Sequence, residues 1–167
     1  ADLRDGDDEF DSSQLVIQAR VFAGSGNDLI LTGALADSVD AGAGNDTVST
    51  GAGNDTANGG NGADSIDIRG GSGNDLLNGN AGFDTLFGDD HDDELNGGTQ
   101  NDALFGGSGN DDISGDAGDD RIFADGDDTA SGGTGDDSIR GGQGADILRG
   151  NNDSDTLHGD QQNDTLE

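Results

Sequence analysis

Aliphatic side chains recur along this sequence every nine residues, each of them two positions after an aspartate. They are Ile30, Val39, Val48, Ala57, Ile66, Leu77, Leu86, Leu95, Leu104, Ile113, Ile122, Ala130, Ile139, Leu148, Leu157 and Leu166. One apolar residue between two variable ones predicts a three-residue strand, with the middle side chain facing inward and its neighbours outward. The six Gly- and Asp-rich residues that separate these strands predict turns.

The aspartates define a nonapeptide of the form Gly-Gly-x-Gly-x-Asp-x-(apolar)-x, in which Asp is the sixth residue. The sixth-position residues are Asp28, Asp37, Asp46, Asp55, Asp64, Asp75, Asp84, Asp93, Asp102, Asp111, Asp120, Asp128, Asp137, Asp146, Asp155 and Asp164. Thirteen of the fifteen intervals between them are nine residues long. An eleven-residue interval follows Asp64, where Ile68 and Arg69 are added, and an eight-residue interval follows Asp120.

The second position of the repeat predicts a special backbone conformation. It is Gly in ten repeats and Asn or Asp in the other six, which are Asn80, Asp89, Asp116, Asp125, Asn151 and Asp160. Because Asn and Asp are the residues other than Gly that best tolerate a left-handed backbone, we expect φ > 0 at this position.

Two nonapeptides close one flat coil with a strand on each side, and successive coils stack with parallel strands. The expected fold is therefore all-β: a parallel β-roll, or β-solenoid, of about eight two-repeat coils over residues 23–167. Residues 1–22 are expected to form a separate N-terminal segment. There Gln14–Phe22 alternates apolar and polar residues, which predicts a longer strand that covers the first coil.

Within that segment, Asp5-Gly6-Asp7-Asp8 is identical to Asp125-Gly126-Asp127-Asp128. Residues 4–11 are therefore either a degenerate seventeenth turn, with Asp8 in its sixth position, or an acidic surface loop. At the other end, the chain stops at Glu167 without a capping segment. We expect either a truncated chain or an open edge completed by another subunit, a head-to-tail contact that builds filaments.

The composition excludes several classes of function. The 167 residues include 37 acidic and only six basic ones, a formal net charge of −31. This charge opposes binding to nucleic acid, and no apolar run is long enough for membrane insertion. Low hydrophobicity with high charge is typical of disorder, and cysteine is absent, so disulfides cannot stabilise the coils.

A divalent cation between successive turns would resolve this conflict. Sixth-position carboxylates in adjacent coils repel one another, and carboxylates and turn carbonyls are the oxygen ligands that Ca²⁺ takes, six to eight at a time. Eight turns on each side leave at most 14 internal sites, and 14 Ca²⁺ ions would bring the net charge from −31 to about −3. We therefore expect calcium to drive folding.

Stretches such as Gly42-Ala43-Gly44-Asn45-Asp46-Thr47-Val48 and Gly71-Ser72-Gly73-Asn74-Asp75-Leu76-Leu77 closely resemble the RTX (repeats-in-toxin, hemolysin-type) family. The resemblance covers residues 23–167. It implies a calcium-loaded β-roll that is exported by a type I system, unfolded at low cytosolic calcium and folded outside the cell. The expected location is extracellular or on the cell surface.

The resemblance also implies a ligand set. The sixth-position aspartates are ligands, joined by carbonyls of the first four turn positions. The glycines at these turns are Gly24, Gly26, Gly42, Gly44, Gly51, Gly53, Gly60, Gly62, Gly71, Gly73, Gly107, Gly109, Gly133, Gly135, Gly142 and Gly144. The fourth-position Gly is replaced by Leu35, His91, Gln100, Asp153 and Gln162, and the repeat at 124–131 is one residue short, so about ten to fourteen Ca²⁺ ions are expected.

Phe87, Phe105 and Phe123 all occupy the ninth position and are eighteen residues apart, so they should stack on one face of three consecutive coils. Such a ladder is either a surface for lateral self-association or cross-strand packing that stiffens the sheet.

Catalysis has little support in the sequence, because His91 and His158 have no second His or Cys at ligand spacing. We therefore expect that the protein is not an enzyme. A structural module of an extracellular fibre, surface layer or adhesin is preferred. The alternative is the C-terminal secretion and folding module of a type I-secreted enzyme or toxin. Ice binding through a Thr array at the third position is disfavoured, because only Thr99 and Thr134 are Thr there.

Overall fold

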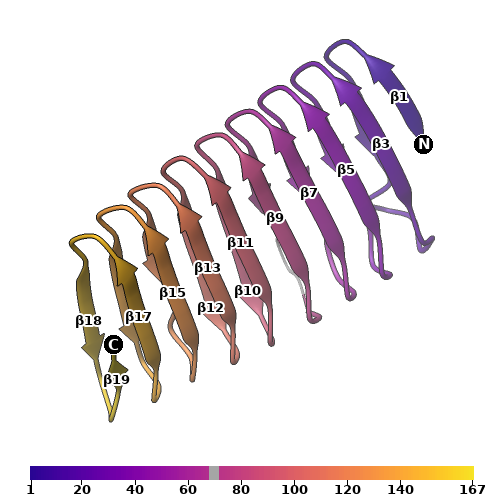
Figure 1. The fold of residues 1–167 in the computed structure, drawn as a ribbon. Helices are drawn as coiled ribbons and strands as arrows, with labels where there is room; N and C mark the ends of the chain where they lie inside the picture. The colour runs from indigo at the N-terminus through magenta and orange to yellow at the C-terminus, as the bar shows by residue number, and fades with distance from the viewer. Residues whose placement is uncertain (68–71) are drawn as a thin grey trace.

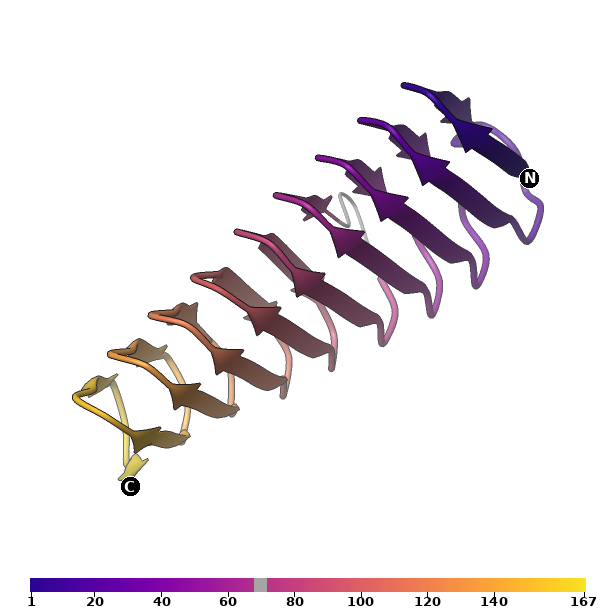
Figure 2. The ribbon, with the colours of Figure 1, turned by 45° about the horizontal axis from the view of Figure 1, so that its top comes forward.

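Two parallel sheets face each other along the length of the molecule, and the chain crosses from one to the other in every half-coil (Figures 1 and 2). The structure is a computed structural model that describes residues 1–67 and 72–167. The first sheet contains β1 (Asp2–Asp5), β3 (Arg20–Ser25), β5 (Ser38–Ala43), β7 (Thr56–Asn61), β9 (Leu76–Ala81), β11 (Glu94–Thr99), β13 (Asp112–Ala117), β15 (Thr129–Thr134), β17 (Ile147–Asn152) and β19 (Thr165–Leu166). The second contains β2 (Glu9–Asp11), β4 (Leu29–Leu31), β6 (Thr47–Ser49), β8 (Ser65–Asp67), β10 (Thr85–Asp90), β12 (Ala103–Ser108), β14 (Arg121–Phe123), β16 (Ser138–Gly142) and β18 (Thr156–Asp160).

Each strand pairs in parallel with the strand one full coil away, and equivalent repeat positions lie side by side. Leu95 pairs with Ile113 in the first sheet, and Leu104 pairs with Ile122 in the second. The predicted all-β parallel solenoid is confirmed, with about nine turns instead of eight. The described residues contain no helix, and hence none that could cross a bilayer.

The strands are longer than the sequence pattern predicts. Many run for six residues, from the seventh position of one repeat to the third position of the next, where three were expected. The first half of the predicted turn also pairs with the coil beside it: Gly98 lies opposite Asp116, and Thr99 opposite Ala117. Because successive coils repeat one conformation, the backbone of the turn finds partners in the next coil.

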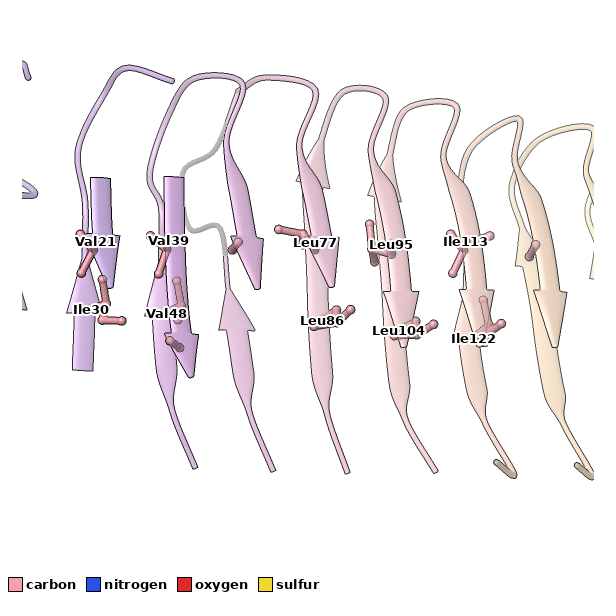
Figure 3. Close-up of a cluster of buried hydrophobic side chains, with 14 of the residues drawn as sticks. Val21, Ile30, Val39, Val48, Leu77, Leu86, Leu95, Leu104, Ile113 and Ile122 are labelled. Carbon is pink, nitrogen blue, oxygen red and sulfur yellow. The ribbon is translucent and has the colours of Figure 1, made fainter. Parts of the chain in front are cut away.

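The core lies between the sheets and consists of the eighth-position side chains (Figure 3). From Ile30 to Leu148 they are fully buried, except that the side chain of Ile66 lies outside the described part. Small first-position residues such as Ala23, Ala41 and Ala124 are buried beside them. In the last coil Leu157 is half-buried and Leu166 is 51% exposed.

The left-handed backbone expected at the second position is present at all six Asn and Asp residues, with φ between 69° and 79°. It is also present at eight of the nine described glycines there, the exception being Gly33. Arg4 adopts the same conformation, with φ of 83°, at the second position of a turn that ends at Asp8.

The N-terminal residues form a coil of their own. β1 pairs with β3 and β2 pairs with β4, which accounts for the ninth turn. The degenerate turn at residues 4–11 is therefore part of the solenoid.

The longer strand predicted over Gln14–Phe22 is wrong. β3 begins at Arg20, which lies opposite Ser38, the first residue of β5. Leu15, Val16 and Ile17 lie in no strand, and 46–76% of their surface is exposed. The alternation of apolar and polar residues continues through this segment, but β3 starts only where the register with β5 supplies a partner.

We predict that two adjacent side chains of β17 differ sharply in their effect on stability. Leu148 is fully buried, so Leu148→Ala should lower the free energy of unfolding by about 2–5 kcal/mol. Ile147 is 36% exposed on the outer face, so Ile147→Ala should cost less than about 1 kcal/mol. Urea denaturation in saturating calcium measures both, and equal losses would contradict the inward and outward assignment.

Candidate metal centre

The sixth-position aspartates form two continuous rows, one at each lateral edge of the solenoid. One carboxylate oxygen of each residue accepts a hydrogen bond from a backbone amide in the preceding coil. The amide of Asp84 donates to Oδ1 of Asp102, and the amide of Asp102 donates to Oδ1 of Asp120, both at 2.8 Å. All sixteen predicted aspartates take part in this pattern, at distances of 2.7–3.1 Å.

The rows continue through the irregular repeats. The amide of Asp55 donates to Asp75, twenty residues away, across the interval that contains Ile68 and Arg69. Those two residues lie outside the described part of the chain. Across the short repeat, the amide of Asp111 donates to Asp128, seventeen residues away. The register of the aspartates is thus kept while the number of intervening residues changes.

The second carboxylate oxygen has no hydrogen-bond partner in most of these residues, although it is buried. This holds for Oδ2 of Asp8, Asp28, Asp46, Asp55, Asp64, Asp75, Asp84, Asp93, Asp102, Asp111, Asp120, Asp128, Asp137 and Asp146. A buried polar atom without a partner costs about 1–3 kcal/mol, and more when it is charged. A row of such atoms indicates that a proton or a cation belongs beside each one.

The first-position glycines leave the space into which these oxygens point. A Cβ atom added at Gly97 would lie 2.6 Å from Oδ2 of Asp102 and 2.9 Å from the carbonyl oxygen of Gly115, in the next coil. At Gly88 both corresponding distances, to Asp93 and Gly106, are 2.5 Å. At these turns, a carboxylate oxygen and a carbonyl oxygen from adjacent coils therefore face one small space that a side chain in place of the glycine would fill.

This donor set fits calcium. Within residues 1–67 and 72–167, His, Cys, Asp and Glu do not gather in groups of three that could hold a metal, so carboxylates alone cannot fill a coordination shell. A cation held here would therefore draw its remaining ligands from backbone carbonyls, and a mixed shell of carboxylate and carbonyl oxygens suits Ca²⁺ better than the strict octahedron of Mg²⁺.

Burial changes the protonation of the carboxylates when no cation is present. Removal from water, followed by repulsion from the Asp75 and Asp111 carboxylates, raises the pKa of Asp93 from 3.8 to about 8. Burial likewise raises the pKa of Asp102 and Asp128 to about 7. Near neutral pH, each of these three carboxyl groups is therefore present in both its protonated and its charged form.

The predicted turn glycines differ in how the structure uses them. Thirteen of the sixteen have a positive φ: Gly24, Gly26, Gly42, Gly44, Gly51, Gly53, Gly60, Gly62, Gly107, Gly133, Gly135, Gly142 and Gly144. Gly73 and Gly109 are not in the left-handed region. Gly71 lies outside the described residues, so the expectation for it stays a prediction.

The turn with Leu35 departs furthest from the pattern. Oδ2 of Asp37 accepts a hydrogen bond from the amide of Gly33 at 3.1 Å, so it is not free to face a cation. Neither Gly33 nor Leu35 has a positive φ. Asp37 is therefore the sixth-position aspartate with the weakest support as a ligand.

The other four fourth-position replacements keep the left-handed turn but change its shape. His91, Gln100, Asp153 and Gln162 have φ between 76° and 85°. Fourth-position glycines such as Gly44 and Gly82 have φ of 145° and 152°. A side chain restricts a residue to the ordinary left-handed region, whereas Gly reaches beyond it. The backbone at these four positions therefore differs in φ from that of the regular turns.

The sequence analysis missed a second ladder, at the fifth position. There the side-chain oxygen accepts from the following coil: the amide of Asn45 donates to Oδ1 of Asn27 at 2.9 Å, and the amide of Ala63 donates to Oδ1 of Asn45 at 3.0 Å. The signal was present, because eleven of the sixteen fifth positions are Asn or Asp. The two ladders run in opposite directions, so a turn that takes part in both is tied to both of its neighbours.

A parallel β-solenoid with a carboxylate oxygen and carbonyls facing a shared space at its turns defines a class of repeat protein built to hold cations. The family model of the RTX calcium-binding nonapeptide repeat (4 copies) matches residues 20–39, 31–66, 69–104, 96–130, 124–157 and 131–166. The chain belongs to this family. It matches no curated protein and no solved structure.

The raised pKa values predict an inverse pH dependence for the calcium-free chain. The folded state holds more protons than the unfolded state between the usual pKa of 3.8 and the raised value of about 8, so its stability falls as pH rises through this window. Metal-free protein should show more β-structure by circular dichroism at pH 5 than at pH 8. With calcium the order should reverse, because the ion competes with protons for the carboxylates. A metal-free chain that is equally folded at both pH values would contradict this.

Proposed function

We propose that this chain is a secreted, calcium-binding structural module whose folding is driven by Ca²⁺. It would serve in an extracellular fibre, surface layer or adhesin, and carry no catalytic role. The observation that carries the proposal is the row of buried Oδ2 atoms without hydrogen-bond partners. A fold that places a charged oxygen out of water at nearly every turn is unfavourable until a cation neutralises it.

The proposed ligands are the sixth-position aspartates together with carbonyls of the first four turn positions. Aspartate Oδ1 fixes the spacing of the coils through its hydrogen bond to the preceding coil, and Oδ2 remains available to the ion. The bound ion would supply positive charge between carboxylates of adjacent coils. We propose ten to fourteen ions, with Asp37 the least favoured site.

Self-association is the assembly part of the proposal. Parallel stacking is a contact that each coil makes with a nearly identical coil, so a second copy could continue it head to tail. The ladder of Phe87, Phe105 and Phe123 offers a lateral surface. Its rings stack at 4.7 and 5.1 Å as the sequence predicts, and Phe123 is 40% exposed.

The alternative is that the roll is the secretion and folding module of a type I-secreted enzyme or toxin. Family membership favours this reading as well, because RTX proteins are typically exported by type I systems. Both readings share the calcium-driven folding, and they differ in whether the roll itself assembles.

Calcium should determine whether the chain folds at neutral pH. In EGTA we expect a random-coil circular dichroism spectrum, and millimolar Ca²⁺ should restore β-structure, whereas the same concentration of Mg²⁺ should not. A chain that is fully folded in EGTA at pH 8 would overturn the proposal.

Two adjacent aspartates provide a matched test of the ligand assignment. Asp111 is buried in the sixth position, and Asp112 is exposed in the seventh. Asp111→Asn should reduce the number of calcium ions bound, measured by titration calorimetry. It should also lower stability in saturating calcium by about 2.7 kcal/mol for each ion lost from a site filled at about 100 Kd. Asp112→Asn removes the same charge and should leave both quantities unchanged, so equal effects of the two variants would count against the assignment.

Electron microscopy separates the two functional readings. A structural module should form regular filaments when purified with calcium, and these should dissolve on addition of EGTA. Protein that stays monomeric in calcium, by light scattering on the same sample, would favour the secretion and folding module.

A further inference from the structure

An open hollow of about 500 Å³ lies on the outer surface where the eight-residue repeat begins. Three successive coils line it: Phe123 and Asp125 from the first, Arg140 and Gln143 from the second, and Asp160 from the third. None of these residues is a sixth-position aspartate, although the hollow adjoins turns at Asp125 and Gly142 whose backbone carbonyls are among the proposed calcium ligands. Its volume falls within the range of about 300–1,000 Å³ that is usual for small-molecule sites.

The hollow coincides with the one shortened repeat. Between Asp125 and Asp127 the chain has a single residue, Gly126, whereas the next turn has both Gln143 and Gly144 between its second and fifth positions. The longer turn hydrogen-bonds back to the shorter one, because the amide and side chain of Gln143 both donate to Oδ1 of Asp125 at 3.2 Å. Because these two stacked turns differ in length, the edge of the solenoid is uneven here, whereas turns of equal length stack evenly in the regular coils.

An aromatic ring forms one wall of the hollow. Phe105 covers one face of Phe123, with centroids 5.1 Å apart and ring planes 4° from parallel. The other face is turned toward the next coil, where Arg140 is the register partner of Phe123. Phe87 and Phe105, further along the ladder, are half-buried, but Phe123 is 40% exposed. The ladder therefore ends in an apolar platform that faces the hollow.

The polar groups around this platform are both donors and acceptors. Arg140 forms an ion pair with Asp160, which fixes the guanidinium across the hollow and leaves further N–H donors. The amide of Gln143 and the carboxylates of Asp125 and Asp160 add planar hydrogen-bonding groups.

The charges select a neutral ligand. Two carboxylates and one guanidinium line the hollow, and the chain has a net charge of −31, so an anion is repelled. A cation is disfavoured by Arg140, which carries positive charge and already pairs with Asp160. A neutral molecule with one apolar face and many hydroxyl groups satisfies both the ring and the planar polar groups.

We propose that this hollow binds a sugar ring of a neutral glycan, with the apolar face of the sugar against Phe123 and its hydroxyl groups hydrogen-bonded to Asp125, Arg140 and Gln143. The irregular repeat thereby gives the module a binding function in addition to its calcium-driven folding. This inference rests on the proposed function only in that the roll must be folded.

Calcium-loaded protein should be tested by saturation-transfer difference NMR with methyl β-D-glucopyranoside, methyl β-D-galactopyranoside, methyl α-D-mannopyranoside and N-acetylglucosamine, and with methylammonium and acetate as charged probes. We expect at least one neutral sugar to bind. Phe123→Ala should weaken that binding by about tenfold or more. Phe87→Ala removes a ring from the other end of the same ladder, outside the hollow, and should leave the affinity within about twofold.

The outcomes separate this inference from the proposed function. A chain that calcium folds, by circular dichroism of the same sample, but that binds none of the sugars overturns the inference alone. Equal weakening by Phe123→Ala and Phe87→Ala, or stronger binding of either charged probe, also overturns it. A chain that calcium does not fold overturns the proposed function, and with it the hollow, which exists only between stacked coils.

Discussion

The buried carboxylate of the sixth position is the constraint on which the rest of this structure depends. One oxygen is committed to the amide of the preceding coil, and the other lies out of water without a partner in fourteen turns. These hydrogen bonds keep the carboxylates in register, and at most turns a first-position glycine leaves room beside them. Each strand contributes only one large aliphatic side chain, the eighth-position residue, to the core. The hydrophobic core is therefore small for a chain with a net charge of −31.

The fold tolerates changes in repeat length because the aspartate ladder, not the number of residues, sets the register. The ladder spans twenty residues at Asp55 and Asp75, and seventeen at Asp111 and Asp128, with the same amide-to-carboxylate bond. The fifth-position ladder adds a bond in the opposite direction at most turns. A coil held from both sides can therefore carry an irregular turn without disturbing its neighbours.

The nine-residue periodicity of the sequence predicted well which residues take part in this arrangement. The inward residues, the left-handed second position and the stacking of Phe87, Phe105 and Phe123 all follow from equivalent positions lying side by side. The six-residue strands and the start of β3 at Arg20 could not be predicted in the same way. Both depend on which backbone groups find partners in the adjacent coil, a property of the stacked structure that residue type alone does not report.

The same reasoning explains why the candidate sites differ in kind. Where the repeat is regular, each turn repeats the same carboxylate, carbonyl and glycine arrangement, so the chain can present only one chemistry, cation binding, many times over. A different chemistry requires a break in the repeat. The turn at Leu35 keeps its ladder but loses the free oxygen of Asp37. The short turn at Asp125 also keeps its ladder, and it borders a hollow beside Phe123 that side chains of mixed character line. The second kind of break therefore adds a different chemistry to an intact scaffold, and that is why the binding site is inferred there.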